Sequence, residues 1–111
     1  MLTDLVEKVQ SVTKSHTECL EIGDGIKASM IWSMNHQAQE ACTLLKAHPI
    51  FSKSEFNILA LSQGALIGRY IVEACDLPFR VRNFVTVGAP NNGVDFQEDC
   101  NHAGLVEMDR C

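Results

Sequence analysis

The residues of this sequence that are best suited to chemistry lie in the segment Ala60-Leu61-Ser62-Gln63-Gly64. A serine with a small residue two positions before it and two after it is typical of a nucleophile elbow, a sharp turn from a strand into a helix that is usually written Gly-x-Ser-x-Gly. Bulky residues at the flanking positions would collide with the strand or the helix. Gly64 meets this requirement, and Ala60 adds only a methyl group to the usual glycine. The pattern predicts that Ser62 is the nucleophile of an acyl-cleaving enzyme.

The residue after the serine is expected to act through its backbone. In such a turn the N–H of the following residue, here Gln63, can donate to the negative charge that develops on the substrate oxygen. The helix that follows directs the positive end of its dipole to the same place. A second interpretation is that Ser62 only caps the helix in an ordinary turn between a strand and a helix.

Hydrophobic patterns predict the elements around this turn. Residues 56–61 are a near-continuous apolar run, which favours a strand buried on both faces, as in a parallel sheet. Residues 65–74 carry a periodic apolar stripe and are predicted to be helical. Residues 81–87 have the composition of the next strand, and residues 88–93 have that of a loop. Ser62 should therefore stand at the carboxyl edge of the sheet, where open α/β sheets place their active sites.

The upstream half is predicted to continue the same alternation. Apolar residues at helical spacing indicate a helix over about residues 2–15, residues 19–22 have the composition of a short strand, and residues 33–47 are predicted to be helical. Either Ser33 or Asn35 is suited to cap that last helix. Alternating helices and strands imply a parallel sheet covered by helices.

The predicted fold class is α/β, with a three-stranded parallel sheet flanked by helices. Doubly wound sheets usually have more strands than three, so the chain is interpreted as the central piece of a larger fold. Residues 1–111 are assigned to this one partial domain, because no internal repeat, low-complexity segment or linker divides them.

Composition and charge argue against several classes of protein. The chain has 111 residues, a net charge of −5 and a pI of about 5.2, whereas a nucleic-acid-binding domain would carry a basic face. No apolar run approaches the ~18 residues of a transmembrane segment. The first residues are mixed in character and include acids, unlike a signal peptide.

The sequence contains five cysteines, so at least one thiol is unpaired or is bonded to another chain. No two of them form a Cys-x-x-Cys pair, which argues against a zinc site or a thioredoxin-like motif. From the residues alone, buried free thiols and disulfides both remain open. The cysteines are Cys19, Cys42, Cys75, Cys100 and Cys111.

The segment from Phe56 to Gly64 resembles a motif of the palmitoyl-protein thioesterases, which belong to the α/β-hydrolase superfamily. It matches Tyr/Phe-Asn-x-x-Gly-x-Ser-Gln-Gly except that Ala60 replaces the first glycine. Gln63 after the serine is characteristic of that family. The other residues that carry the resemblance are Asn35, Gln37, Cys42, Arg69, Cys75 and the segments 83–88 and 92–94, and with them it extends over about residues 18–111.

The resemblance implies a partial α/β-hydrolase fold and a function. The intact protein is expected to be a lysosomal or secreted serine hydrolase that removes long fatty acyl groups from protein cysteines through an acyl-serine intermediate. Its substrates would be S-acylated proteins or long-chain acyl thioesters, with no metal or organic cofactor and no nucleic-acid partner. Ser62 would be the nucleophile and the Gln63 N–H an oxyanion donor. The oligomeric state is not indicated.

The resemblance also implies a cysteine pairing. Disulfides are expected between Cys42 and Cys75 and between Cys100 and Cys111, which leaves Cys19 as the odd thiol. The first of these bonds would tie the helix before the nucleophile strand to the helix after it.

Other parts of the catalytic machinery are not found where the family carries them. The His-Gly-x-Gly-Asp segment, which supplies the second oxyanion donor, would precede residue 1, and the acid and the histidine would follow residue 111. Asp95, Asp99 and His102 follow Ser62 in sequence but lie too early for the usual triad positions. Two alternatives therefore stay open, a non-catalytic remnant of the family and a related lipase or esterase. The histidines that precede the serine are interpreted as surface or helix-end residues: His16, His36 and His48.

Overall fold

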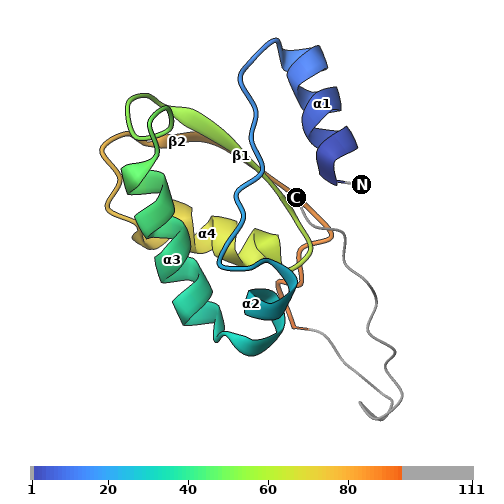
Figure 1. Ribbon diagram of the computed structural model, residues 1–111, viewed down its shortest axis with the longest axis vertical. Helices are drawn as coiled ribbons and strands as arrows, with labels where there is room; N and C mark the ends of the chain where they lie inside the picture. Colours follow the sequence, from blue (N-terminus) through green and yellow to red (C-terminus); the bar gives the residue numbers. More distant parts are fainter. Residues whose placement is uncertain (1, 94–111) are drawn as a thin grey trace. The chain divides into compact units, whose positions relative to one another are not determined.

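The structure is a computed structural model that describes residues 2–93 of the 111. The chain divides into two compact units, and of the described residues 2–31 belong to the first and 32–93 to the second. None of the described helices has the length and apolar character that crossing a membrane requires. The elements are α1 (Leu2–Thr13), α2 (Ile26–Ile31), α3 (Met34–Ala47), β1 (Phe56–Leu61), α4 (Gly64–Ala74) and β2 (Val81–Val87) (Figure 1).

The first unit opens with the expected amphipathic helix. Leu5 and Val9 lie on the partly buried side of α1, which ends at Thr13. Lys14 has a φ of 56°, and its N–H donates to the carbonyl oxygen of Gln10 at 2.9 Å. This is a left-handed cap at the helix C-terminus, and it ends α1 two residues before the predicted boundary at residue 15.

The strand expected over residues 19–22 is not present. These residues are described and pair with no strand, so the sheet of the described part has two strands rather than the expected three. A strand forms only where its backbone can hydrogen-bond to a neighbouring strand, and the composition of a segment does not determine whether such a neighbour is present. The sequence pattern also missed the short helix α2. The carboxylate of Asp24 accepts a hydrogen bond from the N–H of Ala28 in its first turn, at 2.9 Å.

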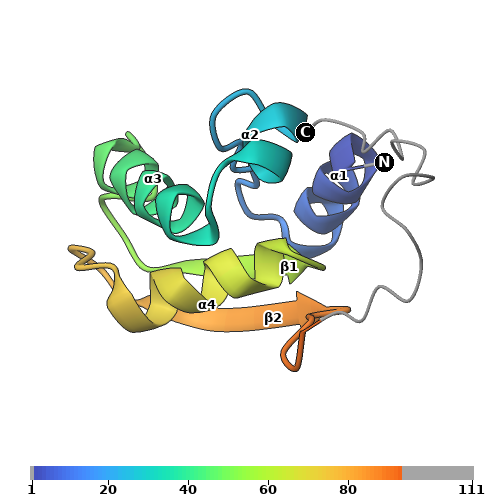
Figure 2. The same cartoon turned by 90° about the horizontal axis from the view of Figure 1, so that it is seen from below.

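The second unit is built on the succession β1–α4–β2, with the two strands parallel. After an irregularity between Phe56 and Asn57, the strands pair in continuous register from Asn57 with Asn83 to Leu61 with Val87. Both strands have the bounds that the sequence predicts. Because the strands are parallel, their carboxyl ends lie at the same edge of the sheet (Figure 2). The turn after β1 and the loop after β2 therefore meet at that edge.

Helix α4 lies against both strands, and α3 packs on α4 (Figures 1 and 2). Helix α4 comes close to the sheet at Gly68, where an added Cβ would be 2.6 Å from Cε2 of Phe84 and 3.4 Å from Cβ of Ala60. The small residues at these positions let the helix come close to the strands. The buried apolar residues of this unit are Ala38, Ala41, Leu45, Phe56, Ala60, Ala65, Ile67 and Ile71.

Both ends of α3 are defined by hydrogen bonds. The hydroxyl of Ser33 accepts from the N–H of His36 at 3.2 Å, so Ser33 rather than Asn35 is the N-cap. His48 is the C-cap, and its N–H donates to the carbonyl oxygen of Leu45 at 3.2 Å. The interpretation of His48 as a helix-end residue is confirmed.

A disulfide joins α3 to the end of α4. Cys42 and Cys75 are bonded, with their Cα atoms 5.6 Å apart, and this is the pairing that the resemblance implied. Cys19 is also disulfide-bonded, so the expectation that it is the odd thiol is wrong. Cys19 was expected to be unpaired only because the other four cysteines had been assigned to pairs, and such an argument gives no information on where its side chain lies. The expected Cys100–Cys111 pair lies outside the described residues.

One face of the two-stranded sheet is covered by α4 and the other is not. Ala60 and Phe84 lie on the covered face. On the opposite face Leu59, Val85 and Val87 are 43%, 53% and 56% exposed. The prediction of a strand buried on both faces is therefore right for one face only in the described part of the chain.

Removing the disulfide is expected to destabilise the protein. The bond between Cys42 and Cys75 closes a loop of 33 residues, which the chain-entropy model equates to about 3–4 kcal/mol. Replacing both cysteines with alanine should lower the free energy of unfolding, measured in urea, by about this amount. An unchanged free energy would show that the cross-link does not constrain the unfolded chain.

Gly68→Ala tests the close contact between α4 and the sheet. Alanine favours a helix over glycine by about 1 kcal/mol, but overpacking against the Phe84 ring costs about 1–3 kcal/mol. We expect a net loss of about 1 kcal/mol in urea-induced unfolding. Gly64→Ala on the same helix is the matched control, because no described atom lies within 4 Å of its added Cβ. A Gly68→Ala variant as stable as the control would contradict the contact.

Candidate functional site

Ser62 directly follows the last residue of β1 and adopts a φ of 49°. Among the described residues, Lys14 is the other non-glycine residue with a positive φ. This backbone conformation costs an L-residue roughly 1–2 kcal/mol, so its surroundings must hold it in place. The N–H of Ser62 donates to the carbonyl oxygen of Val87 at 2.9 Å, which extends the pairing of β1 with β2 by one residue into the turn. The residue itself is exposed at the sheet edge.

Helix α4 starts at Gly64, two residues after the serine. The N–H of Ala65 donates to the carbonyl oxygen of Ser62 and that of Leu66 to the carbonyl oxygen of Gln63, both at 3.0 Å. The N-cap of α4 is Gln63, with φ −55° and ψ −35° and no side-chain capping bond. Ser62 thus precedes the cap residue. A strained, exposed serine between a strand and a helix is the arrangement that a nucleophile elbow requires.

The side chain of Gln63 reaches back to the beginning of α3. Its Nε2 lies 3.2 Å from Sδ of Met34 and 3.5 Å from Oε1 of Gln37. Gln37 is buried, with 3% of its surface exposed, and its own Nε2 donates to the carbonyl oxygen of Trp32 at 2.9 Å. The family motif contained Gln37 and Gln63, but no spacing in the sequence indicated that the two side chains meet.

The two small residues that flank the serine have different surroundings. Ala60 is buried against α4, at the position where the usual motif has glycine. Gly64 is exposed, and an added Cβ there would meet no described atom within 4 Å. The expected collision at Gly64 is therefore not observed. Gly68, one helical turn further on, is the glycine that the close packing requires.

A shallow groove of about 320 Å³ runs beside α4 and β2. An ion pair on its wall joins Nε of Arg69 to Oε1 of Glu73 at 2.9 Å. Ser62 is not one of its lining residues. The groove is lined by Ala65, Arg69, Val72, Glu73, Phe84, Thr86 and Asn91.

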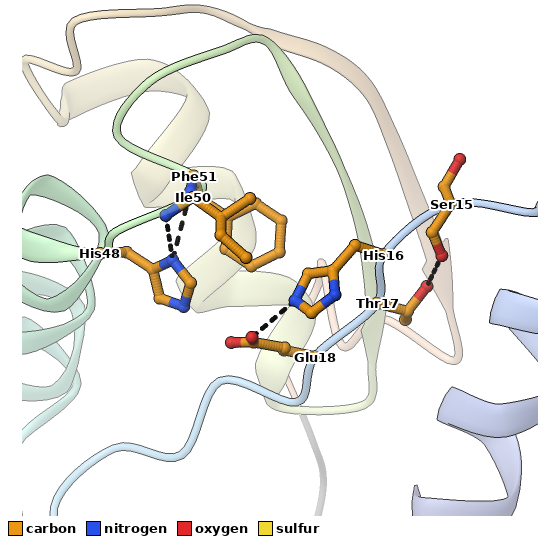
Figure 3. A network of polar contacts seen from close by, with 7 residues as sticks. All are labelled: Ser15, His16, Thr17, Glu18, His48, Ile50 and Phe51. Atoms are coloured by element: carbon orange, nitrogen blue, oxygen red, sulfur yellow. Dashed lines mark hydrogen bonds and ion pairs between the residues drawn. The ribbon is translucent and has the colours of Figure 1, made fainter.

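Two of the described histidines, His16 and His48, make local contacts (Figure 3). Nδ1 of His48 accepts hydrogen bonds from the N–H groups of Ile50 and Phe51, at 3.1 and 3.2 Å. In the first unit, Nε2 of His16 lies 2.6 Å from Oε1 of Glu18. These contacts fit the interpretation of His16, which is exposed, as a surface residue and of His48 as a helix-end residue.

His36 is the remaining described histidine, and it lies in the first turn of α3 with its ring edge-on to Trp32, at a centroid distance of 4.4 Å. Among residues 2–93 no group of three or more histidine, cysteine, aspartate or glutamate side chains is placed to hold a metal ion. The other acid and base candidates, Asp95, Asp99 and His102, lie outside the described residues.

Comparison with known proteins gives one family. The family model described as palmitoyl protein thioesterase matches residues 1–110. The chain is 30% identical over 109 residues to Palmitoyl-protein thioesterase-dolichyl pyrophosphate phosphatase fusion 1 of Schizosaccharomyces pombe, covering 95% of this chain and 17% of the relative. It is 30% identical over 84 residues to Palmitoyl-protein thioesterase 3 of Dictyostelium discoideum, covering 76% and 28%. The chain thus spans less than a third of the length of these relatives. No solved structure matches it significantly.

Replacing Ser62 with glycine is expected to stabilise the protein, because glycine adopts a positive φ without the steric cost. Relative to Ser62→Ala, which lacks the same hydroxyl but keeps a Cβ, Ser62→Gly should raise the free energy of unfolding by about 1 kcal/mol. Urea denaturation of the two variants measures this difference. Ser62→Gly being less stable than Ser62→Ala would contradict a strained backbone at this position.

Proposed function

This chain belongs to the palmitoyl-protein thioesterase family, and from that premise we propose that it carries the nucleophile of a serine hydrolase. The proposed reaction is the cleavage of long-chain fatty acyl thioesters from protein cysteines. The observation that carries the proposal is the conformation of Ser62, which has a φ of 49° and stands exposed between β1 and α4. Family membership supports the choice of a thioester over other acyl substrates.

In the proposed reaction the Oγ of Ser62 attacks the thioester carbonyl carbon. A histidine base, expected from outside the described residues, takes the hydroxyl proton and then gives it to the departing cysteine sulfur. The acyl group is left as an ester of the serine. Water, deprotonated by the same base, then releases the fatty acid and restores the hydroxyl.

The developing oxyanion needs donors that are already in place. Gln63 follows the nucleophile and stands at the N-terminus of α4, where backbone N–H groups and the helix dipole favour negative charge. We assign the Gln63 N–H as one oxyanion donor. The loss of one such donor typically reduces kcat by about 10²–10³-fold. The second donor is expected from outside the described residues.

The disulfides favour an oxidising compartment. Cys42 and Cys75 are bonded, and Cys19 is bonded as well. Disulfides persist in secreted and other oxidising environments and are rare in the cytosol. The proposed location of the intact protein is therefore lysosomal or extracellular, in agreement with the resemblance.

A fluorophosphonate probe tests the nucleophile. In the intact protein, which is expected to contain the histidine base, the probe should label Ser62, as identified by peptide mass spectrometry, because it reacts with activated serines. Ser62→Ala should abolish labelling, and Ser54→Ala, at an exposed loop serine, should leave it unchanged. Absence of labelling in the unsubstituted intact protein would support the alternative of a non-catalytic remnant.

The substrate class is tested separately. A chain that is labelled should hydrolyse an S-palmitoylated peptide in preference to a triglyceride emulsion. The reverse preference would replace the thioesterase assignment with a lipase or esterase on the same fold.

A further inference from the structure

Gln37 is a polar residue in the core of the second unit, with 3% of its surface exposed. Burying an amide is unfavourable by about 1–3 kcal/mol unless its hydrogen-bonding groups are satisfied. Its Nε2 donates to the carbonyl oxygen of Trp32 at 2.9 Å. A carbonyl oxygen can only accept, so this bond determines which end of the Gln37 amide is the NH₂ group. Its Oε1 is then the acceptor that faces Gln63.

The same bond also determines the orientation of the Gln63 amide. The group that meets Gln37 Oε1 at 3.5 Å must be a donor, and it is the Nε2 of Gln63. That Nε2 also lies 3.2 Å from Sδ of Met34, a weak acceptor. The Gln63 side chain is therefore held on the first turn of α3 by contacts that run back to a backbone carbonyl.

We propose that Gln37 is a positioning residue: it fixes the side chain of Gln63 and, through it, the backbone N–H that follows the nucleophile. Gln63 lies between the strained Ser62 and the first turn of α4. A shift of its backbone would move the N–H away from the oxyanion while leaving the serine hydroxyl in place. The catalytic consequence rests on the proposed function, whereas the link between the two side chains does not.

The Cys42–Cys75 disulfide is a second connection between α3 and α4, away from the contact between Gln37 and Gln63. Cys42 and Cys75 tie the middle of α3 to the C-terminal end of α4, while Gln37 and Gln63 join the N-terminal ends of the two helices. With both ends joined, α4 cannot slide along α3 without breaking one of the connections. The amide link is the one at the reactive edge.

The test is a double-mutant cycle in the intact protein, with the unsubstituted protein as reference. Gln37→Met and Gln63→Met each keep the length of the side chain and remove the amide, and Gln39→Met on the exposed side of α3 is the matched control. One readout is the ¹H–¹⁵N spectrum, in which the Gln63 signals report the link directly. The other is the rate of fluorophosphonate labelling at Ser62.

In the spectrum, Gln37→Met should shift both the side-chain NH₂ and the backbone N–H signals of Gln63, and Gln39→Met should leave them in place. In labelling, Gln37→Met and Gln63→Met should each slow the reaction by about ten- to a hundredfold, and the double variant should be no slower than Gln63→Met alone. Gln63 is partly exposed, whereas Gln37 is buried. Gln63→Met therefore removes the contact between the two side chains even if Gln37→Met fails to fold.

Unmoved Gln63 signals in Gln37→Met, or rate effects that multiply in the double variant, would overturn the proposal. If the unsubstituted intact protein is not labelled at all, the proposed function fails, and the spectrum alone then decides whether Gln37 positions Gln63. The two failures are thus distinguishable.

Discussion

The site depends on a backbone conformation that its own residue disfavours. Ser62 is held at a φ of 49° between a strand and a helix, and the cost of that conformation must be met by neighbours on both sides. The carbonyl oxygen of Val87 accepts from its N–H, and its own carbonyl oxygen accepts from the first turn of α4. The turn therefore exists only while β2 and α4 are both in place, so the reactive edge and the β1–α4–β2 unit form together.

Close packing of α4 on the sheet explains why the strict serine motif can change here. The usual first glycine is replaced by Ala60, whose methyl group faces the backbone of α4 at Gly68. The space that one glycine would provide in the strand is provided in part by a glycine in the helix. Gly64, the second small residue of the motif, makes no such contact with the described residues. Small residues are needed where the helix contacts the strand, and one of them, Gly68, lies outside the serine motif.

Two connections of different chemistry relate α3 to α4. The covalent one, between Cys42 and Cys75, lies away from the reactive edge and acts mainly by limiting the unfolded chain. The other is a polar contact between two glutamine side chains at the edge itself, and its value lies in geometry rather than in stability. An exposed apolar face, with Leu59, Val85 and Val87, remains on the side of the sheet that α4 does not cover.

The sequence by itself determined the features that depend on local pattern. The bounds of β1 and β2, the helix between them, the α3 helix and the serine turn all follow from apolar periodicity and small residues over short stretches. The family motif supplied the pairing of Cys42 with Cys75. Tertiary structure decided what depends on neighbours distant in sequence. Residues 19–22 form no strand because no strand pairs with them, Gly68 matters because Phe84 lies above it, and Gln37 meets Gln63 only because α3 folds against α4. Such contacts join residues that no local pattern relates, so their spacing in the chain carries no signal of them.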